Sequence, residues 1–325
     1  MQKPSPRTGS GTLLETPFDC ENQPLTTAPQ PGELQASTVP SPSPRTWKVV
    51  LSYDGTDYRG WQIQPGRPTI QGELQAALGR VVGEAPLPQG SGRTDAGVHA
   101  LAQVASFALQ AQIPADSLLR ALNRTLPASI RILETKMVRN DFHARHSTIA
   151  KTYEYRVYLE RPPHSLGRAI DCPPFLARYV YSFPWPVNFD ALQESARQFL
   201  GTQDFLSFAA TDPDEAARSG EHPTANLMPE DEETGQPGAI RTVFASGWER
   251  HESQDTVQLV YRVRGSGFLH HMVRNMVGTM LDVGRGYRGA GEVPAMIAAR
   301  SRAAAGPTAP ARGLFLACVE YPDDI

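Results

Sequence analysis

From residue 47 onwards, apolar residues either alternate with polar ones or recur at helical spacing. Residues 47–53 alternate as in a half-buried strand, and the Asp54-Gly55 turn follows directly. Apolar positions three and four apart then predict a helix over 70–82, with Thr69 as its N-cap and Gly83 as its stop. The chain therefore has a regular fold that begins near residue 47.

The rest of the chain follows the same two periodicities. The predicted strands span 103–107, 130–138, 152–158, 241–248, 256–263 and 312–321. The predicted helices span about 115–126, 189–200, 268–284 and 293–301. Because strands and helices mix without a regular strand–helix–strand order, the pattern favours an α+β fold over a purely parallel sheet.

Two stretches lack these periodicities. Residues 1–46 hold nine prolines among Ser, Thr and Gln, a composition that cannot repay the entropy of ordering, so we expect a disordered tail. Residues 211–238 are acidic and rich in Pro and Gly, which is typical of a flexible, solvated insertion. The predicted organisation is a tail, an α+β lobe over 47–148, and a second α+β lobe over 149–325 that carries the insertion.

The distribution of charge changes the picture that the net charge suggests. The whole chain carries −3, but the tail accounts for −1 and the insertion for −7, so the remainder carries +5 and can meet phosphates. Three widely spaced cysteines argue against a disulfide framework. No apolar run reaches 18 residues, and the N-terminus does not resemble a signal peptide. We therefore expect a cytoplasmic protein without a membrane span.

The strongest candidate for chemistry is Asp95, within the run Gly90-Ser-Gly-Arg-Thr-Asp-Ala-Gly-Val-His-Ala100. Glycines around it allow backbone conformations and close approaches that a Cβ would forbid, while Arg93 and His99 supply hydrogen-bond donors. An aspartate that only caps its own turn is the structural alternative. The turn thus predicts either a catalytic carboxylate or an Asx-type turn.

Two further clusters allow more than one interpretation. The segment Phe142-His-Ala-Arg-His146 suits an RNA-facing patch or a solvated loop; it lacks a supporting carboxylate or cysteine at a spacing suited to a metal site. Tyr153 and Tyr155 share one face of a predicted strand, which by itself favours core packing. A tyrosine there could also stack on an extruded base.

The predicted helix after Gly265 combines core residues with one cation. Met272, Met276 and Met280 form a stripe at helical spacing that indicates packing in the core. Arg274 lies on the same helix, where a buried guanidinium needs a carboxylate partner. Asp95 is the candidate partner.

Between about Trp47 and Pro322 the chain resembles the tRNA pseudouridine synthase A family. The string Gly92-Arg-Thr-Asp-Ala-Gly-Val-His99 matches the active-site motif of that family residue for residue. The other matching motifs, in family order, are Tyr53-Asp-Gly-Thr, Gly60-Trp-Gln, Gln103-Val-Ala-Ser-Phe, Phe142-His-Ala-Arg, Tyr153-x-Tyr155, His270-His-Met-Val-Arg-Asn-Met-Val-Gly278 and Gly313-Leu-Phe-Leu316.

The resemblance implies the pseudouridine synthase fold, in which two related lobes with mostly antiparallel sheets and flanking helices surround a central cleft. It implies isomerisation of uridine to pseudouridine at about positions 38–40 of the tRNA anticodon stem-loop by a homodimer that needs no organic cofactor and no metal. The implied site roles are Asp95 as nucleophile, Arg93 in base flipping, Tyr153 in stacking on the base, Arg274 as partner of Asp95, and Leu314 in the uracil pocket. Contact with RNA is expected of Phe142, His143, Ala144, Arg145, His146 and Arg241.

This chain departs from the family pattern in its long tail, in His146 where the family often has Phe, and in the acidic insertion, which we expect to tune RNA access by repelling phosphates. Two other classes of function were weighed. A noncatalytic RNA-binding protein would not need the intact Asp95 motif, and an Asp-nucleophile hydrolase would need further carboxylates or a phosphate loop that the sequence lacks. A pseudouridine synthase with a different RNA target stays open.

Overall fold

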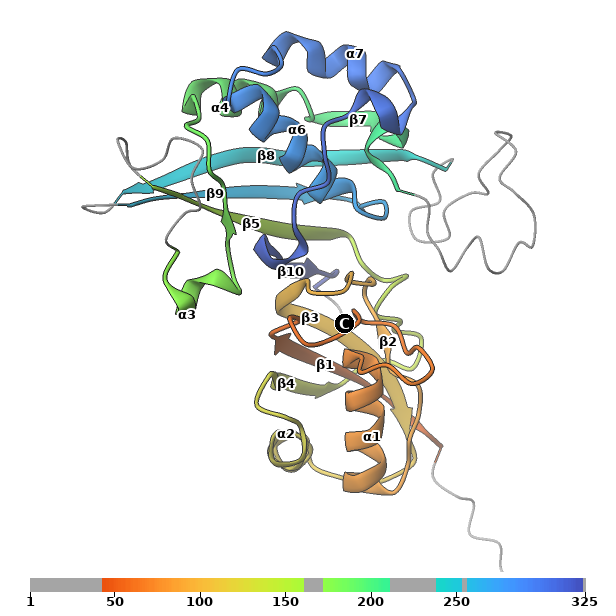
Figure 1. Cartoon of the computed structure of the whole chain (residues 1–325). Helices are drawn as coiled ribbons and strands as arrows, with labels where there is room; N and C mark the ends of the chain where they lie inside the picture. Colours follow the sequence, from red (N-terminus) through yellow and green to blue (C-terminus); the bar gives the residue numbers. More distant parts are fainter. Residues whose placement is uncertain (1–42, 161–171, 211–237, 253–255, 324–325) are drawn as a thin grey trace, which may run out of the picture. The chain divides into compact units, whose positions relative to one another are not determined.

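The computed structural model describes residues 43–160, 172–210, 238–252 and 256–323 (Figure 1). Nearly all of the predicted tail and of the predicted insertion lies outside these residues. The first strand, β1 (Arg45–Tyr53), begins two residues earlier than predicted. The α+β class and the mostly antiparallel sheet that the sequence predicts are both confirmed.

The first half of the fold follows the periodicity closely. Helix α1 (Ile70–Val82) begins where Thr69 Oγ1 accepts a hydrogen bond from the Gly72 amide, and it ends at Gly83, whose φ of +74° is left-handed. The other elements of this half are β2 (Gln89–Gly90), β3 (His99–Leu109), α2 (Ala115–Thr125) and β4 (Ile130–Met137). Strand β3 is longer than predicted because its pairing with β1 continues over the whole length of that strand.

The second half contains more and shorter elements. Its strands and α-helices are β5 (Ala150–Glu160), α3 (Pro174–Ala177), β6 (Tyr181–Ser182), α4 (Phe189–Arg197), β7 (Gly201–Asp204), β8 (Ile240–Glu252), β9 (Thr256–Gly265), α6 (Met272–Gly284), α7 (Val293–Ala298) and β10 (Leu314–Glu320). Four 3₁₀ helices cover Leu206–Phe208, Ala290–Glu292, Arg302–Ala304 and Ala311–Gly313.

Three helices of this half are shorter than the sequence predicts. Helix α6 starts at Met272 rather than at residue 268, because His271 has a left-handed backbone with φ +60°. Arg300 also has a positive φ, of +48°, so α7 ends before it. Helix α4 ends at Arg197 instead of residue 200. In α6 and α7 a positive φ, which apolar spacing does not encode, limits the helix, whereas after α4 the amides of residues 198–200 bond three residues back instead of four.

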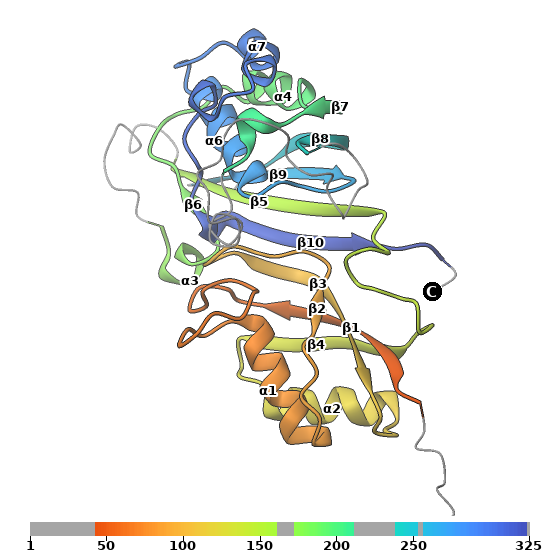
Figure 2. The ribbon, with the colours of Figure 1, turned by 90° about the vertical axis from the view of Figure 1, so that its right-hand side faces the viewer.

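The strands join in one sheet whose main path is β4-β1-β3-β10-β5-β9-β8-β7, with β2 beside β3 and β6 beside β5 (Figure 2). Every pairing is antiparallel except β10 with β3 and β5 with β6. The last strand of the chain, β10, thus lies between a strand of the first half and a strand of the second. This position of β10 in the sheet brings the loop that precedes β3 near the helix that follows β9.

The hydrophobic core extends along both halves of the sheet. Helices α1 and α2 pack together, with α2 against β4, whereas α4 packs on α6 and against β8 (Figure 1). The methionines at 272, 276 and 280 are fully buried, as predicted. None of the helices in the described part of the chain combines the length and hydrophobicity needed to cross a membrane.

Glycine 278 gives a test of how tightly α6 packs on the segment 305–309. A Cβ at Gly278 would lie 1.7 Å from the carbonyl oxygen of Pro307, so backbone would have to move. We expect Gly278→Ala to destabilise the fold by about 3 kcal/mol, as overpacked positions do, in urea unfolding. Gly79→Ala in α1 is the control: its Cβ has ordinary contacts, and it should stabilise by about 0.5 kcal/mol. Equal unfolding midpoints for the two variants would contradict the tight packing.

Candidate active site

Asp95 lies on the loop between β2 and β3, and backbone hydrogen bonds fix the conformation of that loop. The Trp61 amide donates to the Thr94 carbonyl at 3.0 Å, and the Val98 amide donates to the Asp95 carbonyl at 3.1 Å. A Cβ at Gly60, whose φ is +90°, would lie 2.5 Å from the Thr94 oxygen. Only glycine therefore lets this neighbouring segment approach the loop so closely.

A buried hydrogen-bond network joins the same loop to strands β1 and β3. The Tyr53 hydroxyl lies 2.8 Å from Thr94 Oγ1, and Gln103 Nε2 donates to the Gly92 carbonyl at 2.9 Å. Ser91 Oγ in turn donates to Gln103 Oε1 at 2.6 Å. Burial raises the pKa of Tyr53 to about 12, so its hydroxyl stays protonated at neutral pH. Because the network fixes the backbone at residues directly before Asp95, the carboxylate is presented in a defined place.

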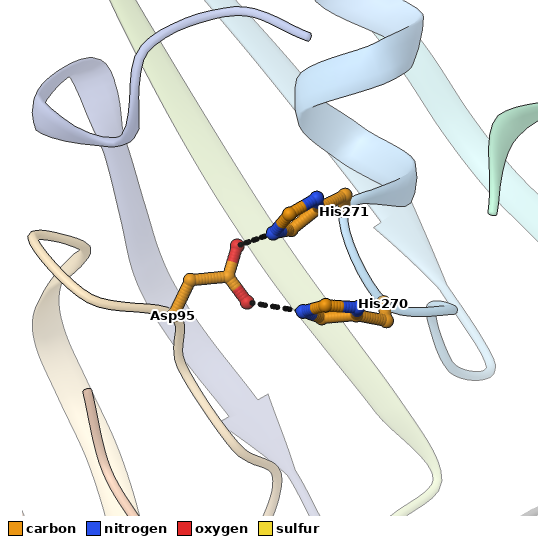
Figure 3. Close-up of side chains that lie close together, drawn as sticks. All are labelled: Asp95, His270 and His271. Atoms are coloured by element: carbon orange, nitrogen blue, oxygen red, sulfur yellow. Dashed lines mark ion pairs between the residues drawn. The ribbon is translucent and has the colours of Figure 1, made fainter. Parts of the chain in front are cut away.

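Three side chains from the second half meet the Asp95 carboxylate. Arg274 Nη1 lies 2.8 Å from Oδ2, His271 Nε2 lies 3.3 Å from Oδ2, and His270 Nε2 lies 3.4 Å from Oδ1. Figure 3 shows the two imidazoles directed at the two carboxylate oxygens. The Asp95 side chain is 20% exposed, so it is mostly shielded yet accessible. Oδ2 is anchored by two groups and Oδ1 by one.

The electrostatics of this cluster favour an ionised carboxylate. Burial by itself raises the pKa of Asp95, but His270, His271 and Arg274 together lower it, and the balance leaves the pKa below its usual value. A carboxylate with a lowered pKa is charged at neutral pH. Asp95 is therefore available as a nucleophile or a hydrogen-bond acceptor.

Arg274 is held in place from its other side. It lies on the buried helix α6, and its Nε donates to the Ala309 carbonyl at 2.8 Å, while the Ala309 amide donates to the Arg274 carbonyl at 3.1 Å. The segment that carries Ala309 is tied to α6 by Thr308 Oγ1, which donates to Asn275 Oδ1 at 2.6 Å. The guanidinium thus reaches Asp95 with little freedom to turn away.

Tyr153 and Leu314 are both largely buried. The Tyr153 ring packs edge-on against Phe268, with 5.1 Å between ring centroids. Burial raises the pKa of Tyr153 well above its usual range, and nearby Tyr53 and Asp95 add to the rise, so its hydroxyl is neutral. Leu314 begins β10 and pairs with Tyr155. Tyr155 is fully buried and belongs to the core, as its alternation predicts.

The predicted RNA-binding segment divides into buried and surface residues. Phe142 and Ala144 are buried and cluster with Val104. Their contact with RNA stays a prediction, to which these side chains could add little exposed surface. His143, Arg145 and His146 are partly or fully exposed, as is Arg93 on the Asp95 loop, and they keep access to a ligand.

Arg241 is buried at the start of β8. Its side chain is only 2% exposed, and its Nη1 donates to the carbonyls of Gly238 and Ile240 at 3.0 and 2.7 Å. These bonds support the backbone where β8 begins. Contact of Arg241 with RNA stays a prediction.

The two histidines beside Asp95 are the residues that sequence reasoning missed. His270 and His271 directly precede α6 and its Arg274, but in the sequence they stood out only as part of the motif His270–Gly278. Their position four and three residues before a cation that was expected to pair with Asp95 was an available signal. What the sequence did not contain was the left-handed turn at His271.

Asp95, His270 and His271 could also hold a metal ion, because their ligand atoms all lie within 4.8 Å of one another. Two imidazoles and one carboxylate are a donor set that suits zinc. The Arg274 guanidinium, however, lies 2.8 Å from Oδ2 of the same carboxylate and would repel a cation there. The arrangement therefore favours a carboxylate paired with its own cation over a metal centre.

Most of this chain is similar in sequence to known proteins of one family. Residues 49–147 and 195–322 match the family described as tRNA pseudouridine synthase. The "tRNA pseudouridine synthase A" of Solibacter usitatus is 44% identical over 278 residues, covering 85% of this chain and all of the relative. Proteins of the same description from Moorella thermoacetica and Latilactobacillus sakei are 41% and 35% identical, covering 84% and 85% of this chain and 98% of each relative.

Proposed function

This chain belongs to the tRNA pseudouridine synthase family, and from that premise we propose that it converts uridines at about positions 38–40 of the tRNA anticodon stem-loop to pseudouridine with Asp95 as nucleophile. The observation that carries the proposal is the Asp95 carboxylate, whose pKa is held below its usual value by His270, His271 and Arg274 against the effect of burial. The exposed basic residues of the protein and the phosphates of tRNA have complementary charges.

The chemistry requires the target base to leave the helical stack. A stacked uracil cannot be detached and turned, so the enzyme must extrude it at a cost of a few kcal/mol, which contacts to RNA offset. We assign Arg93 to this step, because its side chain is exposed two residues from Asp95. The ring of Tyr153, whose hydroxyl is neutral, would stack on the extruded base, and Leu314 would line the uracil pocket.

In the proposed reaction, the glycosidic bond between N1 and C1′ breaks with help from Asp95, the uracil turns, and C5 bonds to C1′. The proton on C5 then leaves, and N1 gains one. Attack on C6, attack on C1′ and proton removal at C2′ all use the same carboxylate. Substrate and product are isomers, so the reaction consumes no redox or energy-carrying cofactor. A homodimer and a cytoplasmic location belong to the same proposal.

The test is a pseudouridine assay on an unmodified tRNA transcript with uridines at 38–40, in buffer containing EDTA. We expect pseudouridine at these positions and none in a matched transcript that carries cytidines there. Tight binding of the transcript without any product would support a noncatalytic RNA-binding role. Product at other uridines only would support a synthase with a different target. Activity that is abolished by EDTA and restored by zinc would show that Asp95 binds a metal ion, and would overturn its pairing with Arg274.

A further inference from the structure

His271 occupies an unusual backbone conformation at the candidate active site. Its φ of +60° and ψ of 1° are left-handed, and among the described residues only one other non-glycine residue, Arg300, has a positive φ. The Cβ of an L-residue makes this conformation unfavourable, and such outliers cluster at functional sites. In this fold, the outlier directs the imidazole of His271 towards Asp95 (Figure 3).

The contact with Asp95 fixes which nitrogen of His271 carries a proton. Nε2 lies 3.3 Å from Oδ2, and a lone pair there would face the negative charge of the carboxylate, so the proton of the ring lies on Nε2. Burial, with smaller effects from His270, Arg274 and Arg302, holds the pKa of His271 below its usual value although Asp95 opposes the shift. The neutral ring then has its lone pair on Nδ1. No hydrogen bond within the described residues uses Nδ1, and the side chain is 27% exposed.

The isomerisation needs a group of this kind, because C5 must lose a proton after it has bonded to C1′. Arginine cannot accept a proton, which excludes Arg93 and Arg274. The Tyr153 hydroxyl is not available as a base, because its raised pKa keeps it protonated and ionising it beside Asp95 would place two negative charges together. His270 directs its Nε2 to Oδ1, the oxygen left freer for attack. His271 is bonded instead to Oδ2, which Arg274 anchors.

We propose that His271 is a catalytic residue, whose Nδ1 accepts the proton that leaves C5 while its Nε2–H faces Oδ2 of Asp95. This inference rests on the proposed function. The C5–H bond breaks and its electron pair forms the C5–C6 double bond, while the proton passes to Nδ1. At the same time C6 gives up an electron pair: that of its double bond goes to N1 or, after attack on C6, that of its bond to Asp95 goes to the carboxylate. Once it holds no bond to the substrate, the Asp95 carboxylate stabilises the imidazolium, which then gives its proton to solvent. N1 takes a proton from solvent, so the exchange is balanced.

The left-handed backbone suggests the variants for a test. Asn and Gly both tolerate this conformation, so His271→Asn and His271→Gly should fold. The Asn amide has no basic lone pair. Single-turnover rates would be measured with transcripts that carry hydrogen or deuterium at C5 of uridine. We expect His271→Asn to slow the reaction about 10²-fold, as loss of a general base does, and to show a primary isotope effect larger than that of the wild type.

His270→Asn is the matched control, since it removes the other imidazole that contacts Asp95. It should lower the rate without raising the isotope effect. Added imidazole should restore deprotonation in His271→Gly, a result that loss of folding cannot mimic. A His271→Asn rate equal to that of the wild type, or a slower rate with the wild-type isotope effect, would overturn the proposal and leave His271 as a positioning residue. Absence of product from wild type would instead refute the proposed function itself.

Discussion

We expect Asp95→Asn to abolish pseudouridine formation, with a loss of about 10⁴-fold or more in single-turnover rate, as removal of a catalytic nucleophile or its equivalent produces. The carboxamide has the shape of the carboxylate but lacks its charge and its nucleophilic oxygen. Its oxygen can still accept a hydrogen bond from Arg274, so the loop and the buried cation keep a partner. The chemistry should therefore fail while the structure persists.

Two measurements separate chemistry from structure in this variant. Filter binding should give a tRNA affinity within a few fold of the wild type, and thermal unfolding should remain cooperative. Asp116→Asn is the matched control, because it changes an exposed carboxylate at the start of α2 in the same half of the fold and should leave the rate unchanged. Wild-type activity in Asp95→Asn would exclude Asp95 as nucleophile. Loss of tRNA binding together with activity would place its role in binding.

The parts of the fold that the sequence predicted are those that local periodicity encodes. The helix over 70–82 has both its cap and its stop within reach of neighbouring residues, and the alternation in β5 assigns Tyr155 to the core without knowledge of any partner. The pairing of Arg274 with Asp95, 179 residues apart, followed from a different rule: a buried guanidinium requires an anion, and the chain offered a suitable one.

The parts that the sequence did not predict depend on contacts distant along the chain or on single backbone angles. Nothing in the residues 314–320 shows that β10 lies between β3 and β5, since their apolar pattern fits any central position in a sheet. Arg241 and Phe142 were expected to contact RNA from the resemblance to the family, but the neighbours that bury them are visible only in the fold. The orientation of His271 was not predictable either, because it depends on one positive φ.

Arg274→Met should lower the rate of pseudouridine formation by about 10²-fold to 10³-fold and shift its dependence on pH, because a preorganised cation is removed from the reacting carboxylate. Arg274 is among the groups that hold the pKa of Asp95 below its usual value. Without the guanidinium this pKa rises, so a smaller fraction of Asp95 is ionised in mild acid. Activity should then be lost at a higher pH than in the wild type, and the ratio of wild-type to variant rates should be larger at acidic than at alkaline pH.

Arg274→Lys distinguishes the charge of Arg274 from its geometry. Lysine keeps the positive charge, so the acidic limb of the pH profile should stay near that of the wild type. A single ammonium cannot reproduce the fork in which Nε binds the Ala309 carbonyl while Nη1 binds Asp95, so the maximal rate should still fall. If Met and Lys variants share one pH profile with the wild type, the cation does not control ionisation of Asp95. The two histidines would then be sufficient to keep the carboxylate charged, and the contribution of Arg274 would be to hold it in position.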